Sequence, residues 1–280
     1  MDQKEKRDII IGASVGILSF AGAMWVKSKI PTSPKIPIVD ENTVLLFQRV
    51  YSPFCVKVAK YLDYKGIPYR TVNVMPILHN KFVKEYSGQS LIPFVKYKGK
   101  IMHDSTAIIK YFEDIKPEPS LMHKDEPELY RDILLLEDWA DEALAPSFNK
   151  LALIYMHEHP EVLSESDDYN MGISLVDNNI EKVAPFVTKK QLDKYGVSLT
   201  DKDALKKRVR SNLDLLSTKL ENKEFLIGDK LTLADIAVAS HLTVAQRIPY
   251  IYEDDLYSDI FEWQKKIFDL SRRRVSATLK

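Results

Sequence analysis

The chain has 280 residues, enough for two modest domains at roughly 100–200 residues each. Hydrophobic residues make up 45% and charged residues 29%, a balance that is typical of globular proteins and excludes a disordered chain. The 40 basic and 40 acidic residues cancel, and without a basic excess the sequence predicts no nucleic-acid partner. A single cysteine, Cys55, excludes an internal disulfide and a cysteine-rich metal site, and we predict no metal site.

An uncharged apolar segment covers residues 9–26, with basic residues on both sides. Its length at ~1.5 Å per helical residue is roughly 27 Å, just enough for the hydrocarbon core of a bilayer. A cleaved signal peptide is the alternative, although its apolar region is usually shorter and no small-residue cleavage site follows closely. We therefore expect a retained single-span anchor over 1–29, in a membrane whose organelle is unknown. A lone cysteine suits a reducing compartment, which favours a cytosolic globular part.

The proline-rich stretch 30–41 cannot form a regular helix and is typical of an extended spacer. The next segment, 42–117, alternates strand and helix patterns. The apolar run 44–47 indicates a strand buried on both faces. Ser52 and Pro53 are typical of a helix start. The remaining expected elements are a strand at 69–74, a helix at 79–86, a strand after Pro93, a return strand from Ile101 and a helix opened by Asp104 and Ser105.

A proline at the start of a strand normally weakens the strand prediction. A cis bond before Pro93 would explain its place, and would present the backbone of Ile92 to a ligand. The expected order of strand, helix, strand, helix, strand, strand and helix is that of a thioredoxin-like domain.

From residue 126 the strand signals disappear, and the segment 126–280 predicts an all-helical domain. A long helical stretch at 129–153 contains Pro146, which we expect to kink or end it. A polar region near 159–203 is broken by prolines and is read as short helices within an insertion. A clear amphipathic helix follows at 204–220. Thr232 and Asp235 have the spacing of a capping box, so Asp235 is interpreted as a helix cap and not as a catalytic acid.

Three short motifs in the first domain carry a family resemblance. Ser-Pro-Phe-Cys at 52–55, Leu-Ile-Pro at 91–93 and His-Asp-Ser at 103–105, in this order, resemble the N-terminal domain of glutathione transferases. Leu62-Asp63-Tyr64, Val72-Asn73-Val74-Met75-Pro76 and the apolar N-terminal segment look most similar to the membrane-associated prostaglandin E synthase type 2 branch. The resemblance implies a glutathione transferase fold: an α/β thioredoxin-like domain and an all-α domain, here preceded by one transmembrane helix.

The resemblance also implies glutathione as the cofactor. Carried over to this chain, the backbone of Ile92, next to Pro93, would pair with the cysteinyl part of glutathione. Ser105 would hold the γ-glutamyl carboxylate at a helix N-terminus, where free N–H groups favour an anion. Asp104 would meet the γ-glutamyl ammonium, and Lys81 the glycyl carboxylate.

One departure from that branch concerns the catalytic residues. The branch carries Cys-x-x-Cys, whereas this chain has Ser52 in the first position and Cys55 in the second, which excludes a two-thiol mechanism. Ser52 could donate a hydrogen bond to the glutathione thiolate, or it could serve only as a helix N-cap. Cys55 could be activated by the helix N-terminus, or it could be an inert core residue.

The expected function is a membrane-anchored, glutathione-dependent transferase or isomerase that acts on an apolar, lipid-like substrate. Two alternatives are a non-catalytic, metaxin-like adaptor of the same fold and a monothiol reductase that uses Cys55. The expected partners are glutathione, the apolar substrate, a membrane bound through residues 9–26, and a second copy of the chain in a homodimer.

Overall fold

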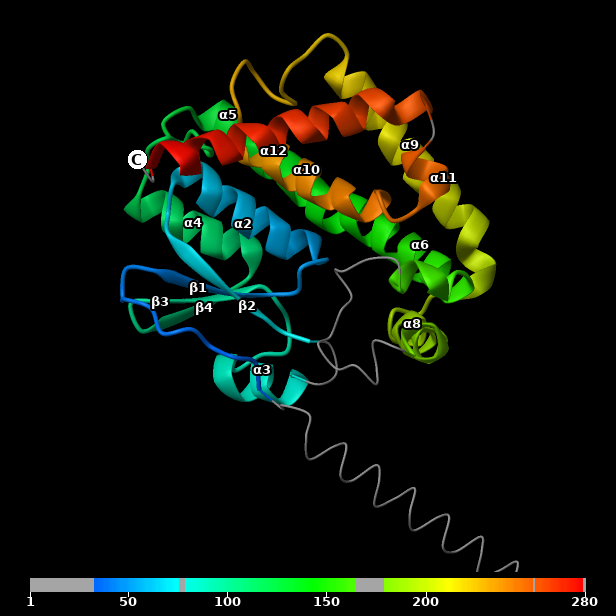
Figure 1. Cartoon of the computed structure of the whole chain (residues 1–280). Coiled ribbons are helices and arrows are strands. Elements are labelled where there is room, and N and C mark those ends of the chain that lie inside the picture. The colour runs from blue at the N-terminus through cyan, green and yellow to red at the C-terminus, as the bar shows by residue number, and fades with distance from the viewer. Residues whose placement is uncertain (1–32, 76–78, 165–178, 254, 279–280) are drawn as a thin grey trace, which may run out of the picture.

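The computed structural model of the protein describes residues 33–75, 79–164, 179–253 and 255–278. A four-stranded sheet with helices on both faces forms the first domain, and a set of helices forms the second (Figure 1). This is the α/β thioredoxin-like domain with an all-α domain that the sequence predicts. Between residues 33 and 43 the chain forms neither helix nor strand, as expected for the spacer.

The first domain has the predicted order of elements. In chain order these are β1 (Val44–Gln48), α2 (Pro53–Lys65), β2 (Tyr69–Asn73), α3 (Asn80–Ser87), β3 (Phe94–Tyr97), β4 (Lys100–His103) and α4 (Ser105–Ile115). The sheet order is β2-β1-β3-β4; β1 and β2 are parallel, while β3 is antiparallel to both β1 and β4. The bond between Ile92 and Pro93 is cis, as predicted.

β1 is buried on both faces because its side chains alternate between two cores. Val44 and Leu46 join the larger core, which α2, α4 and the helical domain share. Leu45 and Phe47 join a smaller core with side chains of α3. α2 and α4 therefore lie on one side of the sheet and α3 on the other (Figure 1).

The second domain is helical throughout its described part. Its elements are α5 (Pro127–Trp139), the π-helical turn η1 (Ala140–Leu144), α6 (Ala145–Glu158), η2 (Pro160–Leu163), α8 (Ile180–Lys194), η4 (Leu199–Asp201), α9 (Lys202–Leu220), α10 (Leu233–Ala245), α11 (Pro249–Tyr252), η5 (Asp255–Tyr257) and α12 (Ser258–Thr278). The π turn lies just before Pro146, which lacks an N–H to donate to the carbonyl of Glu142. The insertion departs from the prediction, because α8 continues through Pro185 instead of breaking there.

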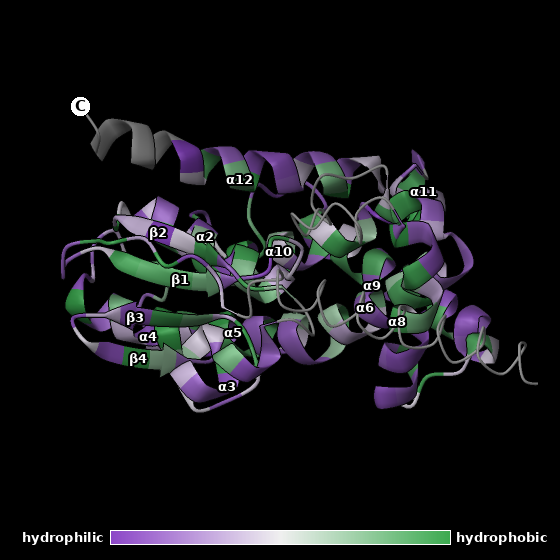
Figure 2. Cartoon of the chain, turned by 60° about the horizontal axis from the view of Figure 1, so that its bottom comes forward, coloured by the Kyte–Doolittle hydropathy of each residue, from purple (hydrophilic) through white to green (hydrophobic). Residues whose placement is uncertain are grey.

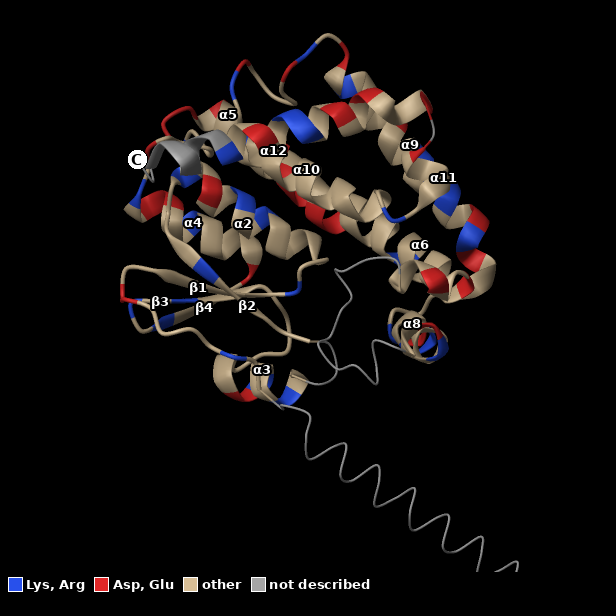
Figure 3. Ribbon diagram, in the orientation of Figure 1, with Lys and Arg blue, Asp and Glu red and all other residues tan. Residues whose placement is uncertain are grey.

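α10 is the central helix of the second domain. All of its residues except Thr243 are buried, and Asp235 is the one Asp, Glu, Lys or Arg among them (Figure 3). It packs against α2, α5, α6 and α12, so its apolar side chains belong to the core that also contains α2 and β1 (Figure 2). One continuous core therefore joins the two domains.

The start of α10 carries the predicted capping box. The Asp235 carboxylate accepts the backbone N–H of Thr232 at 2.8 Å and the Thr232 hydroxyl at 2.7 Å. It also accepts the N–H of Leu226 at 2.8 Å, which fixes the preceding loop. Burial raises the pKa of Asp235 to about 6, although these hydrogen bonds oppose the shift. The interpretation of Asp235 as a cap is confirmed.

The predicted single-pass membrane location needs correction. In the described part of the chain, no helix combines the length and the apolar character needed to cross a bilayer. α10 is apolar but has 13 residues, about 20 Å, against a hydrocarbon core of about 30 Å. α9 and α12 are longer but carry charged residues along their length. We therefore withdraw the membrane assignment; the anchor over 1–29, including residues 9–26, lies outside the described residues.

Replacing Asp235 with alanine should lower the free energy of unfolding by about 2–3 kcal/mol, because two buried backbone N–H groups lose their acceptor. Asp201→Ala is a matched control, since Asp201 belongs to a capping box on the exposed turn η4 and should cost less than about 1 kcal/mol. Urea unfolding of both variants measures the difference. Equal losses would contradict a special role for the buried cap.

Candidate functional site

Three chain segments meet at one end of the sheet. The strand register aligns Phe47 of β1, Phe94 of β3 and His103 of β4 in one row. Antiparallel pairing therefore puts the end of β1, the start of β3 and the end of β4 at the same end of the sheet. The segments that leave this end carry Ser52, Ile92 with Pro93, and Asp104 with Ser105. Five of the seven predicted site residues thus lie in the segments that leave this end of the sheet.

Ser52 lies at the N-terminus of α2 and is half-buried. Its carbonyl accepts the N–H groups of Cys55 and Val56 at 3.0 Å, which starts the helix. Its side chain makes no capping hydrogen bond. The hydroxyl instead lies close enough to the Cys55 thiol to lower the pKa of that thiol slightly. The structure therefore does not support the alternative in which the Ser52 hydroxyl only caps the helix.

Cys55 is fully buried and its thiol is poorly ionised. Burial raises the pKa of Cys55 from 9.0 to about 11, and the opposing contributions of Ser52 and Arg49 are smaller. Reactive cysteines need a lowered pKa and access to solvent, and Cys55 has neither. These observations favour the alternative in which Cys55 is an inert core residue.

The loop before β3 is held in shape by Gln89. Its side-chain amide donates to the Leu91 carbonyl at 2.6 Å, and its side-chain oxygen accepts the Leu91 N–H at 3.0 Å. Pro93 is buried, whereas Ile92 is half-buried. Pairing between β1 and β3 ends at Phe94, so the backbone of Ile92 lies beyond the last pair of the ladder.

Asp104 and Ser105 form the start of α4. Asp104 has a positive φ of 66° and caps the helix, because its Oδ1 accepts the Ala107 N–H at 2.8 Å. The side chain of Asp104 is exposed, while Ser105 is only 4% exposed. The cap thus uses one oxygen of the exposed Asp104 carboxylate.

Lys81 does not lie in the segments that leave this end of the sheet. It lies on α3, which covers the opposite face of the sheet from α2 and α4. Its side chain is 84% exposed and lies 3.7 Å from Glu85, one turn along the same helix. The prediction that Lys81 meets the glycyl carboxylate gains no support from this position.

A buried charged group near the site was not predicted from the sequence. We call it the Lys57 cluster, and it consists of Lys57 of α2, Thr106 of α4, Glu137 of α5, Asp141 of η1 and His241 of α10. The Lys57 ammonium lies 2.7 Å from Glu137 Oε1 and 2.6 Å from Asp141 Oδ2. His241 Nε2 lies 2.7 Å from Asp141 Oδ1. Two signals in the sequence could have found it: a lysine among apolar residues of α2, and a histidine in the otherwise apolar α10.

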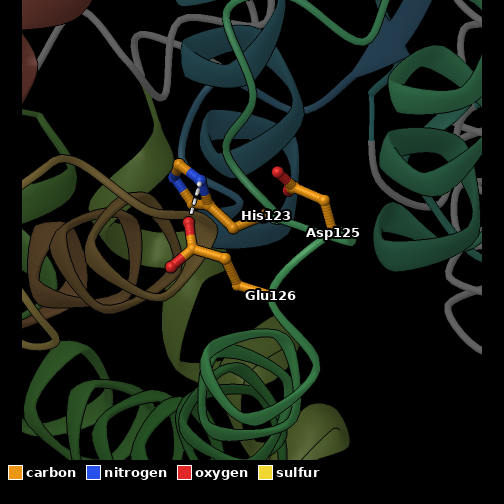
Figure 4. A group of neighbouring side chains, drawn as sticks. All are labelled: His123, Asp125 and Glu126. Atoms are coloured by element: carbon orange, nitrogen blue, oxygen red, sulfur yellow. Dashed lines mark ion pairs between the residues drawn. The ribbon is translucent and has the colours of Figure 1, made fainter.

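The chain between α4 and α5 holds one group with the composition of a metal site. Ligand atoms of His123, Asp125 and Glu126 lie within 4.8 Å of one another, and this is the one such group among the described residues. Figure 4 shows the His123 ring facing the Glu126 carboxylate, to which it lies 3.7 Å away. The Lys230 ammonium also pairs with the Glu126 carboxylate at 3.2 Å and offsets part of the negative charge of the group. Two of the three side chains are exposed, and we assign no metal to this group.

Cys55 should be unreactive in the folded protein. Because a pKa of about 11 instead of 9.0 lowers the thiolate fraction, a maleimide at neutral pH should react roughly a hundredfold more slowly than with the chain in denaturant. Counting modified thiols by mass spectrometry, with and without urea, measures this. Rapid modification of the native protein would contradict the inert assignment.

His241 should make folding stability depend on pH. Burial holds its pKa below the ordinary value of 6.5, although its hydrogen bond to Asp141 opposes the shift. Below pH 6.5 the unfolded chain therefore binds a proton at His241 more readily than the folded chain does. The contribution of neutral His241 to folding stability is complete above pH 6.5 and falls as the pH drops below that value. In His241→Gln the amide can still donate to Asp141 but does not titrate. Urea unfolding across the acid range should show a steeper loss of stability in the wild-type protein.

Comparison with known proteins adds to this geometry. The model of the glutathione S-transferase N-terminal domain matches residues 46–120, and that of the glutathione S-transferase C-terminal domain matches residues 175–270. Together they match more than half of the chain. A search of curated proteins finds no match.

Many solved structures share the fold. The β-etherase LigF from Sphingobium sp. strain SYK-6 superposes with a TM-score of 0.62 at 19% identity, covering 84% of this chain and 98% of its own. Glutathione transferase F7 from Populus trichocarpa gives 0.60 at 16% identity, with 85% and 99% covered. A glutathione S-transferase from Methylobacterium radiotolerans, in complex with glutathione sulfonate, gives 0.57 at 17% identity, with 84% and 94% covered.

Nothing in these comparisons points to the prostaglandin E synthase branch as the nearest relation, so that finer assignment stays a prediction. The two family models, in their proper order along one chain with the fold described above, establish the wider assignment. The chain belongs to the glutathione transferase superfamily.

Proposed function

We propose that the protein is a glutathione-dependent transferase that acts on an apolar electrophile, with the glutathione thiol held beside Ser52. The observation that supports this proposal is that the segments with Ser52, with cis-Pro93 and with the start of α4 all leave the same end of the sheet. Each of these groups suits one part of the tripeptide.

Glutathione would bind through three kinds of contact. Ser105 and the N-terminal N–H groups of α4 suit the γ-glutamyl carboxylate, because a helix N-terminus attracts anions. The exposed carboxylate of Asp104 suits the neighbouring ammonium group. The backbone of Ile92, beyond the end of the β1–β3 ladder, suits the cysteinyl amide groups. We leave Lys81 out of the proposed site.

Ser52 would stabilise the sulfur in its reactive form. On binding, its hydroxyl would donate to the glutathione thiolate, while the neighbouring Cys55 S–H could donate to the Ser52 oxygen. A hydrogen bond to the charged form lowers the pKa of the glutathione thiol and raises the fraction ready to react.

The reaction itself is a displacement by sulfur. The glutathione thiol releases its proton to solvent, and the thiolate attacks an electrophilic carbon of the substrate. A carbon–sulfur bond forms while the leaving group departs with the electron pair of its former bond. The protein contributes by holding the thiolate and the substrate together, which is worth several orders of magnitude in rate.

An apolar substrate is supported by the side chains around Ser52. Val50 is 43% exposed in the loop after β1, and Leu91 is 69% exposed before cis-Pro93. Tyr51 and Phe54 are half-buried on either side of the N-terminus of α2. Apolar side chains left open to water beside a polar site are typical of substrate pockets.

Three other functions remain less well supported. A prostaglandin-type isomerisation would use the same thiolate but needs a peroxide substrate, for which the site has no specific group. A metaxin-like adaptor would have no use for the convergent polar groups. A monothiol reductase needs a reactive thiol, whereas Cys55 is buried with a raised pKa.

The first test is calorimetric titration of the full chain with glutathione, followed by an assay with chlorodinitrobenzene. Ser52→Ala should lower kcat about tenfold to a hundredfold, because the thiolate loses one charge-assisted hydrogen bond. Ser90→Ala, at an exposed serine in the loop before Pro93, is the control and should match the wild type.

No measurable binding of glutathione by the wild-type protein would exclude the proposed function. Binding without turnover, unchanged by Ser52→Ala, would support the adaptor instead. Loss of activity in Cys55→Ser with full retention in Ser52→Ala would favour the reductase.

A further inference from the structure

The Lys57 cluster joins the start of α4 to the helical domain. The Lys57 ammonium donates to the Thr106 hydroxyl oxygen at 3.3 Å, in addition to its bonds to Glu137 and Asp141. The Thr106 hydroxyl in turn donates to Glu137 Oε1. Thr106 directly follows Ser105 in the first turn of α4. The cluster therefore includes the side chain of the residue next to Ser105 in the chain.

The cluster is buried and its charges are directed at one another. Lys57 and His241 are fully buried, Glu137 is 1% exposed and the Asp141 side chain is 13% exposed. Hydrogen bonds to His241 and Lys57 hold the pKa of Asp141 below its usual value against the effect of burial. Taking these charges out of water costs several kcal/mol per ion, so such a group contributes little net stability compared with apolar residues of equal size. What it does supply is a fixed geometry, because each bond has a defined length and direction.

We propose that Lys57 and Thr106 are positioning residues that set the affinity for glutathione by fixing the first turn of α4 against α5 and η1. This inference rests on the proposed function, in which Ser105 holds the γ-glutamyl carboxylate. The cluster lies behind the binding site and touches neither the thiol nor the electrophile. Its loss should weaken glutathione binding and leave the chemical step intact.

A second buried cluster on the same helix provides a matched comparison. Lys65, at the other end of α2, bonds to Glu113 at 2.9 Å, and Glu113 also accepts the Tyr61 hydroxyl at 2.8 Å. The Glu113 cluster therefore also ties α2 to α4, but at the C-terminal end of α4, away from Ser105. A hydroxyl that donates to a buried carboxylate can be removed from either cluster by one conservative substitution.

The test compares Thr106→Val, Thr106→Ser and Tyr61→Phe in the full chain. Thr106→Val keeps the shape of the side chain but removes the hydroxyl, and should raise the dissociation constant for glutathione about five- to tenfold. Its kcat at saturating glutathione should stay within about twofold, because only ground-state binding is lost. Thr106→Ser keeps the hydroxyl and should bind nearly as the wild type does. Tyr61→Phe should lose about as much stability in urea unfolding as Thr106→Val does, yet bind glutathione with the affinity of the wild type.

Glutathione affinity is measured by calorimetry, and kcat with chlorodinitrobenzene. Normal affinity in Thr106→Val would overturn the inference while leaving the proposed function in place. Equal weakening in Tyr61→Phe would also overturn it, because the effect would then follow general stability. Absence of binding by the wild-type protein would overturn both the inference and the proposed function.

Discussion

The burial of α2 on every side is the constraint on which the rest of the structure depends. The sheet and α4 cover one side of this helix, and α10 and α12 pack on the others. Lys57 and Lys65 are enclosed along with its apolar residues. A buried ammonium group is tolerated only with close acceptors, so the residues around α2 must supply them. The two domains are thus joined by polar bonds as well as by a shared apolar core.

These acceptors come from distant parts of the chain. Lys65 bonds to Glu113 and to the carbonyls of Pro117 and Pro119, which lead out of the first domain. Lys57 bonds to Glu137 and Asp141, which lie in the second. α4 is therefore held to α2 near both of its ends. The start of α4, where Ser105 lies, is therefore held in position although it directly follows the end of β4.

The site also illustrates how little of its chemistry the fold decides. Structures with 16–19% identity share the fold over nearly their whole length. A shared fold does not by itself choose a reaction, which depends on the groups at the site. Here the informative groups are a hydroxyl at the N-terminus of α2 and a buried thiol one turn later. Because Cys55 is buried and its pKa is raised, the proposed function assigns the role beside the glutathione thiol to the hydroxyl and not to the protein's own thiol.

The sequence by itself determined the order of elements, the cis bond before Pro93 and the capping box at Thr232. Each depends on residues that are neighbours in the chain: an apolar run with its turn residues, a proline before a strand, or a Thr and an Asp three positions apart. It also placed Ser52, Ile92, Pro93, Asp104 and Ser105 in one candidate site. That grouping came from motifs in which a local signal and a family resemblance coincide, and the binding role of these residues stays a prediction.

Only the tertiary structure decided what depends on contacts between distant residues. It placed Lys81 across the sheet, which its position in a helical pattern could not reveal. It showed Cys55 to be buried, since the inward face of α2 is defined only by the helices that cover it. It brought Lys57, Glu137, Asp141 and His241 together from four elements. The sequence spacing between them carries no signal, because packing of the two domains, and not local periodicity, makes them neighbours.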